Sequence, residues 1–164
     1  MIYEKLFSPA SIGRLEIRNR VAMTPMGLDI GALAGGVNYD LIAFYGARAK
    51  GGVGPIISGV CQVMDGPGAD EDHQLAARSA ADIDDLGRLM DAVHKHGAKM
   101  FIQLQHPGLG FHLPGRETPV SASAVAMPSG VVPRALTIAE IESTVEAFVT
   151  GAQVAQIAGA DGIE

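Results

Sequence analysis

The sequence lacks the features that point to a secreted, membrane-embedded or nucleic-acid-binding protein. A single cysteine, Cys61, excludes an internal disulfide and a four-cysteine cluster within these 164 residues. Basic residues number 12 against 18 acidic ones, and no basic stripe is present to meet the phosphates of a nucleic acid or an anionic membrane. No apolar run reaches the roughly 18 residues that a membrane-spanning helix needs. The N-terminus has no signal-peptide layout, so we expect a cytoplasmic protein.

Familiar ligand-binding motifs are also missing. The glycine-rich segments 34–38 and 50–54 have neither the spacing of a phosphate loop nor that of a dinucleotide-binding fingerprint after a strand. His94 and His96 are two residues apart in a helical pattern, so they do not share a helix face and predict no metal site. The spacing of the remaining residues supports neither a Ser-His-Asp nor a Cys-His assembly.

What the sequence does contain is a regular alternation of apolar runs and helical patterns. Continuous apolar runs of this kind favour strands that are buried on both faces of a parallel sheet. The order β-α-β-α-β-α-β predicts right-handed crossovers, and a polar-apolar alternation before the first strand predicts a hairpin that caps the N-terminal face of the sheet. The strands are expected at 20–26, 55–60, 99–104 and 159–164, the helices at 38–50, at 82–96 and from 137 onward, and the hairpin at 8–20.

The third helix has the clearest start. Thr137 and Glu140 form the pattern of a capping box, in which each side chain satisfies a backbone N–H of the first turn. The apolar residues that follow at helical spacing predict a single buried stripe. Its members are Ile141, Val145, Phe148, Ala152 and Ala155.

The connections differ in length between the two ends of the predicted strands. Segments 61–81 and 105–136, which follow strands, are long, whereas 51–54 and 97–98, which precede strands, are tight glycine turns. Parallel α/β folds place their ligands at the carboxyl ends of the strands, so we expect function on the long-loop side. A (β/α)8 barrel needs about 250 residues. We therefore expect an α/β fold in which the chain supplies the hairpin and strands 1–4, roughly the first half of such a barrel; a flavodoxin-like open sheet would end on a helix.

Three strand ends carry candidate ligand-binding residues. Pro25, Met26 and Gly27 give an extended backbone that a flat aromatic ligand could approach, although a simple turn explains them too. Gly59 could likewise leave room for a ligand to reach the backbone, but a bulge or close helix packing explains it equally well. Gln103 is the stronger candidate, because its amide offers donors and an acceptor and could match an imide edge. Strand alternation predicts that residues 101, 103 and 105 share the inward face.

Other polar residues near these ends have no such argument. Cys61 could face the site, but a lone cysteine is more often an inert buried side chain. His106 could position a ligand or cap a turn, whereas His73 and His112 lie in loops without interpretable spacing.

Four segments, LFSPASIGRLEIRNRVAMTPMG, FYGARAKGGVGPIISG, AVHKHGAKMFIQLQHPG and AGADGIE, resemble the N-terminal half of the old yellow enzyme family. The resemblance covers essentially the whole chain and is greatest to the NADH:flavin oxidoreductase and 2,4-dienoyl-CoA reductase branch. It implies that residues 1–164 are the N-terminal half of an FMN-binding (β/α)8 barrel. It also implies that Pro25, Met26 and Gly27 lie along the flavin, that Gly59 approaches its pyrimidine side, and that Gln103 bonds its imide edge.

The chemistry implied by the resemblance is a ping-pong hydride transfer. NAD(P)H would reduce FMN, and flavin N5 would deliver hydride to an activated C=C bond of an enone or 2,4-dienoyl-CoA substrate. The catalytic pair is expected just beyond Glu164, so the 164 residues alone would be inactive. An iron–sulfur cluster and FAD would require a longer C-terminal region. We also expect a small-molecule substrate, a homo-oligomer, and no nucleic-acid or membrane partner.

The sequence departs from the family pattern at two positions. Leu109 stands where the family commonly has arginine, and Gly27 stands where one subgroup has a redox-tuning cysteine. Two other functions remain open: an amine or N-methyl oxidising flavoprotein of the same barrel family, and a non-catalytic module made from a truncated barrel.

Overall fold

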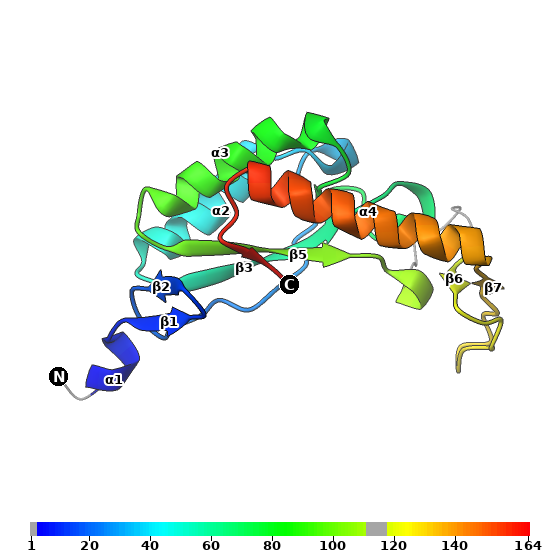
Figure 1. Ribbon diagram of the computed structural model, residues 1–164, viewed down its shortest axis with the longest axis horizontal. Helices are drawn as coiled ribbons and strands as arrows, with labels where there is room; N and C mark the ends of the chain where they lie inside the picture. The colour runs from blue at the N-terminus through cyan, green and yellow to red at the C-terminus, as the bar shows by residue number, and fades with distance from the viewer. Residues whose placement is uncertain (1–2, 111–117) are drawn as a thin grey trace.

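Three long helices lie on one face of a four-stranded parallel sheet (Figure 1). The computed structural model describes residues 3–110 and 118–164. The strand order is β4-β3-β5-β8, and two small two-stranded pairs, β1-β2 and β6-β7, lie outside this sheet. The strands are β1 Ala10–Ile12, β2 Leu15–Ile17, β3 Pro55–Gln62, β4 Leu75–Ala76, β5 Lys99–Gln105, β6 Val120–Ser121, β7 Arg134–Ala135 and β8 Gly162–Ile163. The helices are α1 Glu4–Phe7, α2 Tyr39–Lys50, α3 Ile83–His94 and α4 Ile138–Ile157, with 3-10 turns η1 Leu33–Gly35, η2 Gly66–Gly68, η3 Ala80–Asp82 and η4 Gly108–Gly110.

The predicted strand at 20–26 is much shorter than expected. Only Met23 pairs with the sheet, parallel to Ile56. Its N–H donates to the Pro55 carbonyl at 3.0 Å, and its own carbonyl accepts from Ile57 N–H at 2.9 Å. Pro25 has no N–H to donate and so cannot extend this ladder. The segment nevertheless lies beside β3 and leads toward the carboxyl end of the strand.

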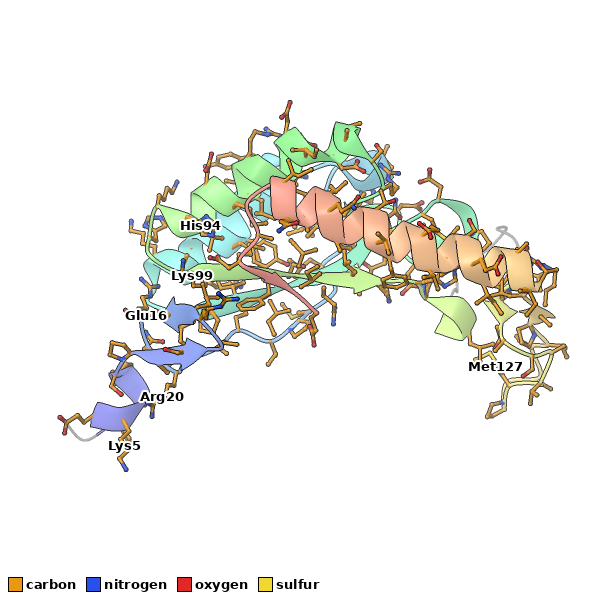
Figure 2. All side chains as sticks on the ribbon, viewed as in Figure 1. Lys5, Glu16, Arg20, His94, Lys99 and Met127 are labelled. Carbon is orange, nitrogen blue, oxygen red and sulfur yellow. The ribbon has the colours of Figure 1, made fainter. Side chains whose placement is uncertain are left out.

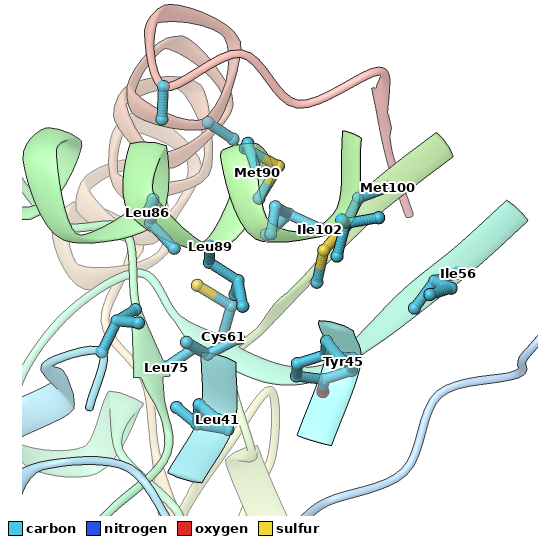
Figure 3. Packing of buried hydrophobic residues seen from close by; sticks show 14 of the residues in the cluster. Leu41, Tyr45, Ile56, Cys61, Leu75, Leu86, Leu89, Met90, Met100 and Ile102 are labelled. Carbon is cyan, nitrogen blue, oxygen red and sulfur yellow. The ribbon is translucent and has the colours of Figure 1, made fainter. Parts of the chain in front are cut away.

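The core lies between the sheet and the helices (Figure 3). Tyr45 of α2 and Leu89 of α3 are almost fully buried against Met100 and Ile102 of β5. The buried phenol oxygen of Tyr45 is hydrogen-bonded, because it accepts the Gly59 N–H at 2.8 Å. Packing of the helices and one specific hydrogen bond together fix the position of β3.

The β1–β2 hairpin closes the end of the sheet where the strands begin, as predicted. Arg18, which follows β2, donates from Nη2 to the Ala49 carbonyl and to the Val53 carbonyl, both at 2.6 Å. Its Nη1 donates to the His96 carbonyl after α3. One guanidinium therefore satisfies carbonyls that the last turns of two helices leave open.

The capping box of α4 is confirmed, but the predicted buried stripe is wrong. Thr137 accepts the Glu140 N–H at 3.3 Å, and Glu140 accepts the Thr137 N–H at 2.8 Å. Val145 is 57% exposed and Ile141 is also exposed, whereas Gly151, Val154 and Ala155 are buried. Only the second half of α4 packs on the sheet, since its first half runs beyond the carboxyl ends of the strands (Figure 1). Among the described residues, no helix is long and apolar enough to cross a membrane.

Candidate functional site

The first-strand end and Gly59 are in direct contact at the carboxyl end of the sheet. A Cβ placed on Gly59 would lie 2.2 Å from the Met26 carbonyl oxygen. Real Cβ atoms essentially never come closer than 3.0 Å to another heavy atom. Glycine at this position is therefore required by the packing of the Met26–Gly27 backbone against β3. Gly59 lies in a bulge of β3, one of its two structural explanations, and it packs against the first-strand backbone and not against a helix. This contact brings two of the predicted site segments together. Met26 itself is 48% exposed on the open side.

Gln103 lies on the sheet face opposite the helices, as the alternation predicts. Its neighbours Met100 and Ile102 are fully buried under the helices, whereas Gln103 is only partly buried. The side-chain Nε2 donates to Glu164 Oε2 at 3.3 Å. The amide thus stands at the strand end with access from the open face, where it could meet a ligand.

A bulge in β3 joins Gly59 to Gln103. The register between β3 and β5 shifts between Ile57 and Val60, and the Ser58 hydroxyl occupies the interruption. Its Oγ accepts the Gln103 N–H at 3.0 Å and donates to the Gly59 carbonyl at 2.8 Å. Bulges of this kind commonly re-aim side chains near functional sites. Here the bulge sets how Gly59 and Gln103 lie relative to each other.

Two glutamines that the sequence did not single out, Gln62 and Gln105, also lie at the carboxyl ends of β3 and β5. Gln62 pairs with Gln105 in register, and the Gln105 Oε1 atom is buried without a hydrogen-bond partner in the described part of the chain. The strand alternation that placed 101, 103 and 105 on one face was sufficient to find Gln105. Gln62 escaped prediction because the bulge changes which residues of β3 share a face.

The loop after β3 places acidic residues against the first-strand end. A Cβ on Gly27 would lie 3.1 Å from Glu71 Oε1, so the carboxyl group covers this glycine. Asp29, which has a left-handed φ of 43°, accepts the His73 N–H at 2.7 Å through Oδ1. Burial, followed by the charges of Asp29 and Asp70, raises the pKa of Glu71. No sequence pattern marks Glu71, since only the folded loop brings it to Gly27.

The remaining candidate residues have structural roles. Cys61 is fully buried under the helices, and this burial raises the pKa of its thiol (Figure 3), so the inert interpretation is correct and the thiol does not face the site. The Nδ1 atom of His106 accepts the Gly108 N–H at 3.1 Å, and burial lowers the pKa of its imidazole. His106 therefore caps the turn. Leu109 lies in η4, and His112 lies outside the described residues.

His94 belongs to an ion-pair cluster at the opposite end of the sheet (Figure 2). Its Nε2 lies 2.6 Å from Asp161 Oδ2, and Lys99 Nζ lies 3.0 Å from Asp161 Oδ1. Burial alone would raise the pKa of Asp161, but hydrogen bonds from Met100 N–H, Lys99 and His94 outweigh it and lower the pKa. In the described ranges, 3–110 and 118–164, no three His, Cys, Asp or Glu residues are placed to hold a metal ion.

A parallel sheet with helices on one face, tight turns at one end and candidate ligand groups at the other is the architecture of part of a (β/α)8 barrel. Residues 5–164 match the model of the NADH:flavin oxidoreductase / NADH oxidase family, and the chain belongs to this family, the old yellow enzyme family. The resemblance of the four sequence segments is thereby confirmed, as is the fold class.

Individual relatives agree with this assignment. The chain is 40% identical to "NADH oxidase" of Thermoanaerobacter brockii and 36% identical to "Cinnamate reductase" of Clostridium sporogenes, with 99% of this chain aligned in both cases. It superposes on morphinone reductase with a TM-score of 0.80 at 27% identity over 96% of its length. The chain spans 25% and 26% of the two relatives and 46% of the morphinone reductase chain.

Proposed function

We propose that the protein is an FMN-dependent oxidoreductase that uses NAD(P)H to reduce an activated C=C bond of an enone or 2,4-dienoyl-CoA type. Family membership supports an oxidoreductase that uses flavin and NAD(P)H. In this proposal residues 1–164 form the N-terminal half of an FMN-binding barrel domain.

The observation that carries this proposal is that three segments come together at the carboxyl end of the sheet, on the face opposite the helices. The exposed Met26–Gly27 backbone lies against Gly59, and the Ser58 bulge links Gly59 to the backbone of Gln103. The segment of Pro25, Met26 and Gly27 would form a wall for a flat ring. The Gln103 amide presents its oxygen and one N–H toward the same open face, while its other N–H donates to Glu164. These residues fit the isoalloxazine group of FMN, with Gln103 on its imide edge.

The residues of this chain would bind and orient the cofactor, whereas FMN when bound supplies the hydride carrier between NAD(P)H and the β-carbon of the alkene. The Gln103 amide would tune the electron affinity of the ring by hydrogen bonding. The missing Cβ at Gly59 would bring the Met26–Gly27 backbone against β3, where that backbone would form the wall for the ring.

The test is the visible spectrum of the longest natural form of the protein. We expect flavin absorption bands that NAD(P)H bleaches under anaerobic conditions and that cyclohexenone restores with formation of cyclohexanone. Colourless protein that does not take up FMN would overturn the proposal in favour of a non-catalytic barrel module. Bleaching by sarcosine, together with no reoxidation by enones, would instead support an amine-oxidising flavoprotein.

A further inference from the structure

A hollow lies between the carboxyl end of β3 and the loop that follows it, beside the segment Pro25–Gly27 that is proposed to contact the flavin. Its volume is about 340 Å³, and its lining includes Leu33 of η1, Gln62 at the end of β3, and Ala69 and Glu71 of the loop. Glu71 also covers Gly27, and Gln62 is the register partner of Gln105, two residues beyond Gln103 on β5. The hollow is therefore contiguous with the residues proposed to hold the cofactor.

Gln62 directs an unused amide into this hollow. Cys61 and Val63 both belong to the helix side of β3, since Cys61 is part of the core and Val63 meets Gly151 of α4. Alternation then turns the Gln62 side chain to the opposite face, where the hollow lies. Gln62 is only 4% exposed, and its side chain makes no hydrogen bond within the described part of the chain. The Gln62 amide atoms are not among the buried polar atoms that lack a partner, so they are accessible from the hollow that Gln62 lines and are available to a ligand there.

The charge around the hollow is predominantly negative. Asp65, Glu71 and Asp72 line it together with one cation, Arg78. Arg78 is already held by two carboxylates, Asp65 at 2.6 Å and Asp82 at 3.1 Å. The Oε2 atom of Glu71 is buried and has no partner among the described residues. Among the described residues, the hollow thus offers hydrogen-bond acceptors with negative charge and an amide oxygen, and the one guanidinium of its lining is engaged.

We infer that this hollow is a substrate subsite for a primary or secondary ammonium group, carried at the end of the substrate remote from the reacting bond. The inference rests on the proposed function for the placement of the reacting bond. Ammonium N–H groups would donate to Glu71 and to the Gln62 amide oxygen, while Leu33 and Ala69 would contact the adjoining carbon chain. A carboxylate or a phosphate at this end would meet like charge, so anionic substrates are disfavoured here.

The raised pKa of Glu71 agrees with this assignment. Burial is the largest cause, and the nearby charges of Asp29 and Asp70 add to it. The charges closest to this carboxyl group are negative, and an ammonium group in the hollow would stabilise its charged form.

Binding of three matched probes to the FMN-loaded, longest natural form of the protein tests the inference. Benzylammonium, benzyl alcohol and benzoate share one ring and differ in charge, and their affinities are measured by ligand-observed NMR without turnover. We expect benzylammonium to bind at least ten times more tightly than benzoate, with benzyl alcohol between them. The isosteric change Glu71→Gln and the change Gln62→Leu should each weaken benzylammonium binding at least five-fold. The matched control Glu16→Gln, on the exposed face of β2, should leave it unchanged (Figure 2).

Equal affinity for benzylammonium and benzoate would overturn the inference, as would unchanged binding in both Glu71→Gln and Gln62→Leu. The two proposals fail separately. Protein that binds FMN and is bleached by NAD(P)H, but shows no ammonium preference, overturns only the subsite. Protein that takes up no flavin, but whose flavin-free form prefers benzylammonium, overturns the proposed function and leaves the ammonium site in place.

Discussion

The Ser58 hydroxyl and the Gln103 backbone are joined by a 3.0 Å hydrogen bond across the interruption between β3 and β5. Ser58 is fully buried, and the same oxygen donates to the Gly59 carbonyl. A single side chain therefore replaces the ladder hydrogen bond that the bulge removes, and it does so between two residues of the candidate flavin site.

Replacement of Ser58 by alanine should destabilise the protein and loosen the cofactor site. The change leaves the buried Gln103 N–H without its acceptor, at a cost of about 1–3 kcal/mol. Urea unfolding and FMN titration measure the two effects. The control Ser123→Ala, at an exposed position, should change neither quantity, and equal stability of the two variants would show that the Ser58 bridge contributes nothing.

Replacement of Gln103 by leucine should weaken FMN binding about ten-fold and shift the midpoint potential of the bound flavin. The change removes the amide proposed to bond the imide edge while approximately preserving side-chain size, and about one net hydrogen bond to the ring would be lost. Fluorescence titration and spectroelectrochemistry measure the result. Gln153→Leu, on the exposed surface of α4, is the matched control, and an affinity and potential equal to wild type would refute the role of Gln103.

Replacement of Arg18 by alanine should lower the free energy of unfolding by about 2–3 kcal/mol. Three backbone carbonyls after α2 and α3 would lose a charged donor, and hydrogen bonds to charged groups are the stronger class. Chemical denaturation measures the loss. Arg14→Ala in the exposed turn of the same hairpin removes the same charge without these contacts; a similar loss in both variants would contradict the assignment.

Asp161 should make the stability of the protein depend on acid pH. Its pKa is lowered in the folded state, so its contribution is present above the unfolded value of about 3.9 and is lost as the pH falls through the folded value. Asp161→Asn should cost about 1 kcal/mol at pH 7, since His94 and Lys99 are about one-third exposed and solvent screens the pairs. The gap from wild type should close below about pH 4.

Unfolding curves at several pH values test this dependence. Asp91→Asn on the exposed face of α3 should show no such convergence. A constant difference between wild type and Asp161→Asn from pH 7 to pH 3 would contradict it.

Local patterns predicted much of the fold. Helix periodicity and caps located α2 and α3, and the Thr137–Glu140 box located the start of α4, because these signals act over one or two turns. The inward direction of Gln103 followed from strand alternation. The helical spacing of apolar residues in α4 did not predict which of them are buried, because the sheet ends halfway along the helix and leaves Val145 in solvent.

The site was only partly predictable, because its contacts join segments that are far apart in the sequence. The sequence marked Gly59 as a position that needs a small residue, but it did not predict that the close neighbour is the Met26 carbonyl, a contact between segments more than thirty residues apart. Glu71 lies in a loop without periodicity, and its position beside Gly27 depends on the whole path of that loop. The direction of the Gln62 side chain was not predicted, because it depends on the bulge and no residue pattern in 55–62 indicates a bulge.

The bulge in β3 also has a consequence for how this strand can change in evolution. Ile56 and Cys61 are five residues apart yet both belong to the helix-side core, which a strand with a strict two-residue repeat does not allow. Loss of one residue between 57 and 60 would leave Ile56 and Cys61 four residues apart, still on one face of a regular strand, but it would remove the bulge that holds Ser58 against Gly59 and Gln103. Substitutions along β3 can therefore be absorbed one at a time, whereas insertions and deletions in this segment should be absent from working descendants.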